Sequence, residues 1–440
     1  MNAPRLAVLH RPHGAAGLRE IFAASRGLCE PHLVLRQEVA EQDPEILRTA
    51  PSFFPVSVCT GDDVTSAVRD MSAAGLVTFH DAELEHVDAA LTALGLPGRS
   101  LIDDAWDKLV QRRAFESAGC SAIRAVPVDR AEDLRNAVAR IGLPAVLKPR
   151  RAAGGGGVAF IGTEADVQHQ LDRRTRWNGL LLETRIPSSA HPSGVGWLGD
   201  FVSVETASVG TDRRHLAVFD KVPVSVVARA GHDGADAVDV TGDVTPSRLP
   251  APAYRAVLDA TSAALDALGV RDRVTHTELR IGSDGAEVIE VNGRVGGHLA
   301  RVLRLVGGPD LIGQALTVAL GVSPAPAPET APGYALGLFA PFPDRTGPVL
   351  SSVSRADLRA LPGVVGVDEV ARQGAARQDT GGRIANLTLR APDSETLDRY
   401  VREVSSGLAG LFAADGMRDD PWLSRLAGGP LEDRRPSHAD

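Results

Sequence analysis

A run of four glycines, Gly154 to Gly157, lies between the short apolar segments VLKP and VAFIG and limits what this region can form. No Lys-Ser or Lys-Thr follows the run and no helical pattern opens directly after it, so the run is not a P-loop. The GxGxxG spacing of dinucleotide-binding folds is also missing. We therefore expect a turn between two strands, in which backbone N–H groups, those of Gly155, Gly156 and Gly157 included, cover phosphates. A plain flexible turn is the alternative.

Lysine is rare in this chain. Only Lys108, Lys148 and Lys221 among the 47 basic residues are lysines, and all the others are arginines. Codon bias explains the excess of arginine, so the lysines that persist are expected where arginine does not serve. A compact ammonium group reaches a phosphate oxygen in a narrow space more easily than a broad guanidinium does. Lys148 lies on the strand that enters the glycine turn, which favours a phosphate site there.

The composition is globular and excludes several classes of protein. The 440 residues, 43% hydrophobic and 23% charged, are enough for about three domains of roughly 150 residues. A net charge of −9 without a basic run argues against a nucleic-acid partner. Three dispersed cysteines without a CxxC pair suit a reducing compartment. With no signal peptide and no apolar run of about 18 residues, we expect a cytoplasmic protein without a membrane partner.

The order of expected elements predicts a multidomain protein of α/β and α+β class. Short apolar strands alternate with helical patterns over the first hundred residues, which is typical of a parallel α/β sheet. Helices are expected at 81–98, 103–119, 251–268, 296–308 and 310–321, and strands at 200–210, 214–227, 275–281 and 286–294. The expected units are an N-terminal domain (1–100), a middle domain (101–322, with lobes at about 120–186 and 187–322), a Pro/Ala-rich linker (323–333), a C-terminal α+β domain (334–426) and a disordered tail (427–440).

Acidic side chains gather on the last two of these strands, which form a hairpin around Ser283-Asp284-Gly285. Antiparallel pairing brings Glu278 close to Glu290, and Asn292 shares a strand face with Glu290. Two carboxylates and an amide oxygen without a basic partner repel one another unless a hard cation lies between them. Such oxygen ligands indicate Mg²⁺ bridging phosphate oxygens, and a solvated acidic edge is the alternative.

Arg294 follows two residues after Asn292 and is expected on the same face. A guanidinium there could neutralise charge on a transferring phosphoryl group. A surface arginine without such a role is the alternative.

Taken in order, these motifs resemble the ATP-grasp superfamily over roughly residues 100–320. The domains on either side resemble those of amino-acid ligases similar to the bacilysin-type and dapdiamide-type synthetases. The Arg-x-Gln-Val-Glu-His run of biotin-linked carboxylation is absent, and so is the Pro-Gly ending typical of D-alanine ligases. The matching pieces are DKL (107–109), GLPAVLKP (142–149), GGGGV (154–158), LETRI (182–186), HTEL (276–279) and IEVNGRVGGH (289–298).

The resemblance implies a role for each matched residue. Lys108 and Lys148 resemble the two lysines that hold ATP phosphates, and Lys221 matches more loosely a basic residue near the terminal phosphate. All three lysines would then serve one ATP site. The hinge that holds adenine, chiefly through backbone groups, is matched by Glu183, Thr184 and Ile186.

The same resemblance implies ATP and magnesium, with two ions expected and Mn²⁺ as a substitute. Glu278, Glu290 and Asn292 resemble the metal ligands, and Arg294 the arginine that stabilises the transition state. His298, at the start of the next helix, is expected to face the acyl substrate or accept the amine's proton, and a helix-start histidine without a catalytic role is the alternative.

The expected function is an ATP-dependent ligase that activates a carboxylate as an acyl phosphate and joins it to an amine, giving an amide or dipeptide, ADP and phosphate. Its partners would be small-molecule carboxylate and amine substrates, and assembly as a homodimer is left open. An ATP-dependent carboxylase or purine-pathway ligase of the same fold is the alternative. A nucleotide-binding module that has lost catalysis is a third hypothesis, against which the full set of acidic ligands argues.

Overall fold

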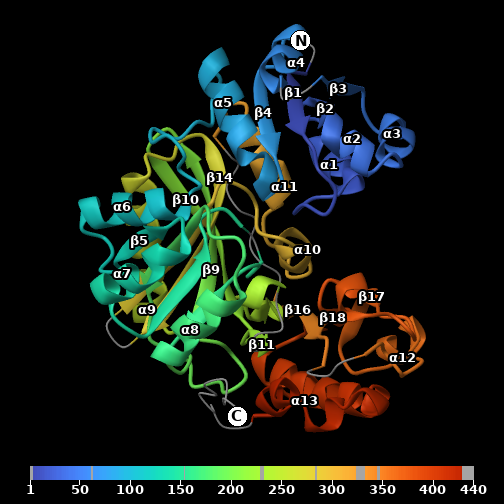
Figure 1. The fold of residues 1–440 in the computed structure, drawn as a ribbon. Helices are drawn as coiled ribbons and strands as arrows, with labels where there is room; N and C mark the ends of the chain where they lie inside the picture. Colours follow the sequence, from blue (N-terminus) through green and yellow to red (C-terminus); the bar gives the residue numbers. More distant parts are fainter. Residues whose placement is uncertain are drawn as a thin grey trace.

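The computed structural model describes residues 3–60, 63–152, 154–227, 232–282, 285–323, 332–343 and 347–428. Residues 283 and 284 of the hairpin turn, most of the 323–333 linker and most of the 427–440 tail lie outside these ranges. Figure 1 shows the N-terminal unit (blue) and the C-terminal unit (red) on either side of helix α10, next to the central part of the chain. In the described ranges, no helix is both long and apolar enough to span a bilayer.

The N-terminal residues form the parallel α/β sheet that the alternating pattern predicts. Its four strands lie in the order β3-β2-β1-β4, and every pair is parallel. Crossover helices connect the strands, as parallel pairing requires. The elements are β1 (Arg5–Leu9), α1 (Leu18–Ser25), β2 (Glu30–Arg36), α2 (Gln37–Gln42), α3 (Ile46–Thr49), β3 (Val56–Cys59), α4 (Val64–Asp70), β4 (Gly75–Thr78) and α5 (Leu84–Leu94).

A second, smaller sheet carries the glycine turn. Its order is β5-β8-β6-β7 with antiparallel pairing, so the segments on either side of the glycines do pair as strands. Helices α7 and α8 bury their apolar residues against it. The elements are α6 (Lys108–Ala118), β5 (Ala125–Val128), α7 (Ala131–Ile141), β6 (Ala145–Pro149), β7 (Ala159–Ile161), α8 (Glu164–Arg173) and β8 (Leu180–Thr184).

An eight-stranded antiparallel sheet organises the rest, in the order β15-β14-β9-β10-β13-β16-β18-β17. Strands from the expected C-terminal domain extend the sheet of the large lobe, because β16 pairs with β13. The expected domain boundaries stay a prediction. The strands are β9 (Phe201–Val209), β10 (Asp212–Lys221), β13 (Gly242–Thr245), β14 (Arg273–Gly282), β15 (Gly285–Asn292), β16 (Tyr334–Pro341), β17 (Val364–Val370) and β18 (Arg383–Ala391).

The remaining elements pack around this sheet. Helix α9 covers one half of an apolar face and helices α13 and α14 cover the other half. Strands β11 and β12 form a separate two-stranded ribbon. The bounds are β11 (Ser225–Val227), β12 (Ala237–Asp239), α9 (Ala251–Ala267), α10 (Leu299–Arg304), α11 (Leu311–Val318), α12 (Arg355–Arg359), α13 (Ser394–Leu411) and α14 (Pro421–Leu426).

Several elements are shorter than expected, each for a local reason. The helix expected from residue 103 begins at Lys108, because the Asp107 side chain accepts hydrogen bonds from the first turn and caps it. Helix α5 ends at Leu94, before Gly95 with its positive φ of 64°. Helix α10 begins only at Leu299, because His298, just before it, has a φ of 63°. The strand expected at 214–227 is two strands, with Pro223 between them.

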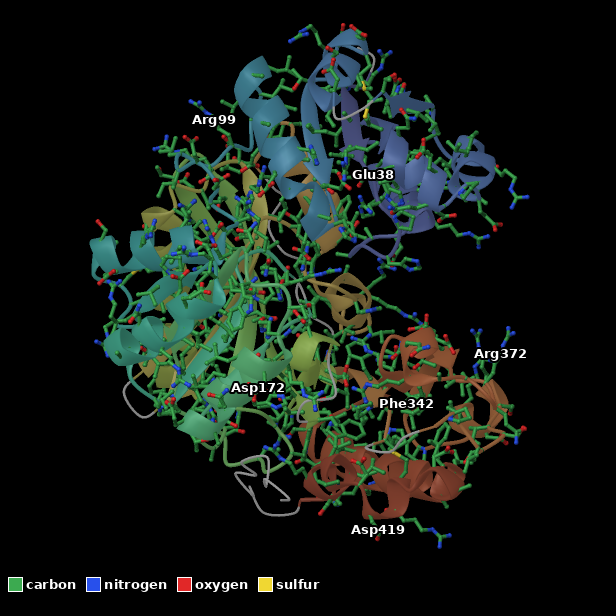
Figure 2. All side chains as sticks on the ribbon, viewed as in Figure 1. Glu38, Arg99, Asp172, Phe342, Arg372 and Asp419 are labelled. Carbon is green, nitrogen blue, oxygen red and sulfur yellow. The ribbon has the colours of Figure 1, made fainter. Side chains whose placement is uncertain are left out.

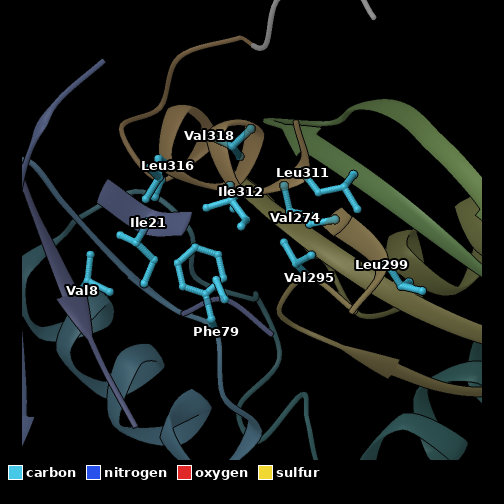
Figure 3. Packing of buried hydrophobic residues seen from close by; sticks show 14 of the residues in the cluster. Val8, Ile21, Phe79, Val274, Val295, Leu299, Leu311, Ile312, Leu316 and Val318 are labelled. Atoms are coloured by element: carbon cyan, nitrogen blue, oxygen red, sulfur yellow. The ribbon is translucent and has the colours of Figure 1, made fainter. Parts of the chain in front are cut away.

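The largest apolar cluster joins the N-terminal unit to the middle of the chain. Figure 3 shows Ile21 and Phe79 of the N-terminal unit beside Ile312 and Leu316 of α11. Figure 2 shows charged side chains such as Arg372 around the outside, where they are exposed. The N-terminal unit is therefore held in place by a shared core rather than by surface contacts alone.

Replacing Ile312 by alanine should lower the free energy of unfolding by about 2–5 kcal/mol, because a fully buried side chain leaves a cavity in this core. Denaturant unfolding measures the change. Val322→Ala, at a residue that is 53% exposed, is the control and should change stability little. An equal loss in both variants would contradict the shared core.

Candidate active site

Lys108 connects the small sheet to the acidic hairpin. It is the first residue of α6, and its Nζ donates to the carbonyl oxygen of Ala152 at 2.7 Å. The same Nζ lies 2.8 Å from Glu290 Oε2. Burial alone would lower the pKa of Lys108, but the charge and hydrogen bond of Glu290, together with the charges of Asp81 and Glu278, make the net shift upward. Lys108 is thus a firmly protonated cation between the segment before the glycines and β15.

Lys148 reaches the same hairpin through two intermediates. Its Nζ donates to Glu183 Oε1 at 2.6 Å, and Arg112 Nε donates to Glu183 Oε2 at 2.9 Å. Arg112 also donates to the backbone of β15, at the carbonyl oxygens of Val288 (2.6 Å) and Ile289 (2.9 Å). Lys148 and Glu290 therefore belong to one connected region.

Neighbouring charges shift the pKa values of Lys148 and Glu183 in this buried group. Burial lowers the pKa of Lys148, with Arg112 acting in the same direction against Glu183. Burial would raise the pKa of Glu183, yet Arg112 and Lys148 together lower it to about 2. Glu183 is therefore ionised at neutral pH, and its side chain neutralises two cations.

The glycine turn packs against the β11–β12 ribbon. Gly154, Gly155 and Gly157 have φ values of 65°, 78° and 76°. A Cβ atom at Gly155 would lie 2.7 Å from the carbonyl oxygen of Val238, so no larger residue fits this approach. Gly156 is exposed at the tip. The turn thus combines an exposed backbone with a conformation that needs glycine.

Glu278 and Glu290 are directly paired across β14 and β15, as the sequence predicts. The premise that these carboxylates lack a basic partner is wrong. Lys108 contacts Glu290, and His276 Nε2 lies 3.2 Å from Glu278 Oε1. His276 Nδ1 in turn bonds Glu205, which is fully buried. The pattern of this hairpin could not reveal Lys108, because that residue comes from α6. His276, in contrast, lies two residues before Glu278 on β14 and shares its strand face.

The His276 imidazole is charged because of this arrangement. Burial would lower its pKa, but the charge and hydrogen bond of Glu205, together with the hydrogen bond to Glu278, raise the value to about 9. Burial would raise the pKa of Glu278, but the hydrogen bond and charge of His276, together with the charges of Lys221 and Arg294, lower it to about 2. Glu205 also accepts from the Gly296 backbone N–H at 3.0 Å. Glu278 therefore stays ionised at neutral pH beside the charged imidazole.

The donor set of the hairpin fits a hard cation. Asn292 Nδ2 donates to Glu290 Oε1 at 3.1 Å, which leaves its Oδ1 as an acceptor near two carboxylates. Magnesium binds in proteins through one or two carboxylates, with phosphates and water completing its shell. No three His, Cys, Asp or Glu side chains come together as a metal site in the described part of the chain. The two glutamates and Asn292 suit an ion that shares its ligands with a nucleotide.

Arg294 is held by the N-terminal unit. Its Nε and Nη2 donate to Asp81 Oδ1 and Oδ2 at 2.8 and 2.5 Å. Burial would lower the pKa of Arg294, but the charge and hydrogen bonds of Asp81, together with the charges of Glu205 and Glu290, make the net shift upward. Asp81 follows strand β4, so the end of the N-terminal sheet contributes directly to this region.

Lys221 and His298 lie farther along the eight-stranded sheet. Lys221 Nζ donates to Asp243 Oδ1 at 2.5 Å, and its charge also acts on Glu278. The His298 ring centre lies 5.0 Å from that of Phe339. Although His298 is exposed, desolvation by the surrounding protein lowers its pKa below 6.5. A neutral imidazole at pH 7 can accept a proton.

The expected hinge has few backbone groups available. The Thr184 N–H donates to the carbonyl oxygen of Arg124, and the Arg185 N–H donates to the carbonyl oxygen of Pro144. Ile186 is half-buried, and its N–H has no hydrogen-bond partner within the described residues. Thr184 Oγ1 is buried and likewise without a partner there. Of the three expected hinge residues, Ile186 retains the free backbone donor, whereas the Glu183 side chain points to Lys148.

The contacts thus connect Lys108, Lys148, Glu183, Glu290 and Asn292 into one network, with Glu278, Lys221 and Arg294 joined to it by charge. Their assigned roles remain predictions. Sequence reasoning missed several partners in this network, although the HTEL motif contained one of them. The missed residues are Asp81, Arg112, Glu205, Asp243 and His276.

Comparison with known proteins identifies the fold. No family model matches the chain. The structure superposes on the L-amino acid ligase of Bacillus licheniformis with a TM-score of 0.65 and 17% identity, covering 92% of this chain and 98% of that one. It also superposes on the biotin carboxylase domain of Hydrogenobacter thermophilus 2-oxoglutarate carboxylase, a complex with MgADP, with a TM-score of 0.61 and 17% identity over 93% and 90%. The chain has the ATP-grasp fold.

The sequence is also similar to part of two proteins that are named as a ligase and a synthase. It is 26% identical to alanine–anticapsin ligase of Bacillus subtilis (strain 168) over 239 residues, which cover 50% of this chain and 48% of that protein. It is 26% identical to carnosine synthase 1 of Mus musculus over 252 residues, covering 56% and 30%. The matched part is thus less than half of either relative.

Replacing Glu183 by glutamine should lower stability at pH 7 by about 3–5 kcal/mol, because Lys148 and Arg112 lose their buried counter-charge. With a pKa of about 2 against an ordinary 4.5, the Glu183 contribution is present above pH 4.5 and disappears as the pH falls through 2. The difference in free energy of unfolding between wild type and Glu183→Gln, measured by denaturant unfolding, should therefore shrink as the pH falls below 4.5.

Glu164→Gln is the matched control, because Glu164 forms an ion pair with Arg135 while its side chain is 65% exposed. Its effect at pH 7 should be within about 1 kcal/mol. If wild type and Glu183→Gln differ in free energy of unfolding by the same amount at every pH, then Glu183 is not the ionised partner of Lys148 and Arg112.

Proposed function

We propose that the chain is an ATP-dependent ligase, which activates a carboxylate as an acyl phosphate and joins it to an amine to give an amide or dipeptide. The observation that carries the proposal is the contact network between the lysines and the acidic hairpin. Lys108 lies 2.8 Å from Glu290, and Lys148 is connected to the same strand through Glu183 and Arg112. Buried ammonium groups beside paired carboxylates suit a triphosphate and its counter-ion.

In this proposal the side chains mainly hold and neutralise phosphates. Lys108 and Lys148 bind phosphate oxygens, and the glycine turn covers them with backbone N–H groups. Lys221 lies nearer the terminal phosphate. Arg294 exchanges Asp81 for the transferring phosphoryl group and neutralises charge that develops there. The Ile186 N–H is the backbone donor left for adenine.

Glu278, Glu290 and Asn292 would hold magnesium, which neutralises phosphate charge and orients the terminal phosphate when bound. Lys108 and His276 contact these carboxylates and hold them in place beforehand. Two magnesium ions, with Mn²⁺ as a substitute, belong to the proposal. Measuring activity against the concentration of Mg²⁺ and of Mn²⁺ tests the number of ions and the substitution.

The reaction then has two steps. The substrate carboxylate attacks the terminal phosphorus of ATP, so ADP leaves and an acyl phosphate forms. The amine attacks the acyl carbon, phosphate leaves and one proton of the amine must be removed. His298, with its lowered pKa, is a suitable acceptor for this proton.

Amino acids are the proposed substrates. Alanine–anticapsin ligase and the L-amino acid ligase carry amino-acid substrates in their names, which favours an amino acid as both carboxylate and amine. The proposed enzyme thus acts on small molecules, and we place it in the cytoplasm. A homodimer is a candidate assembly, because the biotin carboxylase domain on which the structure superposes is described as a dimer.

A phosphate-release screen over pairs of amino acids, with mass detection of the amide, tests the function. We expect release that needs ATP, magnesium and both substrates, and a product mass equal to the pair minus water. Release that depends on bicarbonate would instead support a carboxylase. ATP binding without release under any condition would contradict the ligase and support a module without catalysis.

Replacing Glu290 by alanine should lower the turnover rate at least about a hundredfold, because a metal ligand and the partner of Lys108 are lost together. Steady-state phosphate release measures this effect. Glu287→Gln, on the same strand but bonded to Ser121, is the control and should retain activity. Retained activity in Glu290→Ala would remove the metal assignment.

A further inference from the structure

The sheet face that carries Glu278 and Lys221 continues into the C-terminal strands. Directly paired residues of neighbouring strands project from the same face. The opposite face is apolar there and packs on α13, with Leu338 and Leu387 in its core. Two rows extend the polar face: the first contains Lys221, Asp243, Gly337 and Thr388, and the second contains Phe339, Asn386 and Glu369.

Arg383, the first residue of β18, lies on this face. Its guanidinium carbon is 4.5 Å from the centre of the Phe339 ring. Within the described residues, no group accepts a hydrogen bond from this guanidinium, and no carboxylate oxygen lies within 4.0 Å. Nearby arginines differ in this respect, since Arg377 holds Asp239 and Arg301 holds Asp368.

The carboxylates around Arg383 are already engaged. Asp243 accepts from Lys221 at 2.5 Å, and Glu369 accepts from Asn386 Nδ2 at 3.0 Å. Asp239 is paired with Arg377. Burial lowers the pKa of Arg383, although these three acids act in the opposite direction. A half-buried arginine without an anion of its own is costly unless a ligand supplies one.

Two further features mark this place as a ligand wall. Phe339 contacts both the His298 ring and the Arg383 guanidinium, so it connects the proposed proton acceptor to the free cation. Asn386 Oδ1, next to Phe339 in the row, is buried and has no hydrogen-bond partner within the described residues. A cation, an aromatic ring and an unpaired acceptor therefore lie together.

We propose that Arg383 binds the carboxylate of the amine-bearing substrate, which is thus an amino acid rather than a simple amine. The carboxylate of the other substrate is consumed in the reaction and belongs beside the lysines and the hairpin. The carboxylate of the amine donor survives in the product and needs a separate cation. Arg383 supplies it, near His298 but on strands beyond Lys221. This inference rests on the proposed ligase function.

Steady-state kinetics of Arg383→Gln test the assignment. The amine donors are the amino acid that gives the fastest phosphate release in the screen and its carboxamide, each with the same carboxylate substrate. We expect the KM for the amino acid to rise about 10- to 100-fold, while the KM values for ATP and for the carboxylate substrate stay unchanged. The carboxamide, which lacks the anion, should be used equally by both proteins.

Arg390→Gln is the matched control, because Arg390 is exposed on the same strand. Thermal unfolding and ATP binding check that each variant is folded. Arg383→Lys, which keeps the charge but not the paired donors, should give an intermediate KM. If Arg383→Gln does not fold, the wild type alone tests the inference. Its kcat/KM should be at least tenfold higher for the amino acid than for the carboxamide, and equal values would contradict the inference.

An unchanged KM for the amino acid in Arg383→Gln, with an active wild type, overturns the inference and leaves the ligase function intact. A rise only in the KM of the carboxylate substrate overturns it as well and assigns Arg383 to that substrate. A wild type without activity on any pair removes the ligase function, and the inference falls with it.

Discussion

Charge compensation between strands is the constraint on which this structure depends. Two glutamates face each other across β14 and β15, and each would be unstable without a cation. Lys108 and His276 supply the positive charges from a helix and from the same strand. Because both cations are themselves buried, each also needs its acid. The site is thus arranged before any ligand binds, as electrostatic preorganisation requires.

The same principle joins the units of the chain. Glu183 neutralises Lys148 and Arg112, and Arg112 then fixes the backbone of β15 beside the small sheet. Asp81 at the end of the N-terminal sheet holds Arg294. The N-terminal unit and both lobes of the middle domain therefore contribute groups to one region, and an apolar core keeps the N-terminal unit from separating.

Local patterns predicted much of this fold. The strand–helix alternation, the glycine turn between two strands and the register that pairs Glu278 with Glu290 were all readable, because they depend on neighbouring residues. Helix ends were less predictable: Asp107 starts α6 late, and the φ of His298 delays α10. The continuation of the large sheet through β16 could not be predicted, since it depends on pairing across residues far apart in sequence.

The sequence by itself determined the chemistry available: three lysines, an acidic hairpin with Asn292, and a glycine turn. Residue type and short spacing suffice for such features. Only the tertiary structure decided which charges neutralise which, because Lys108 meets Glu290 and Arg294 meets Asp81 across separate elements. It also decided that Arg383 stays without an acid of its own in the described part of the chain. Pairing of this kind depends on distances in space, which no local pattern encodes.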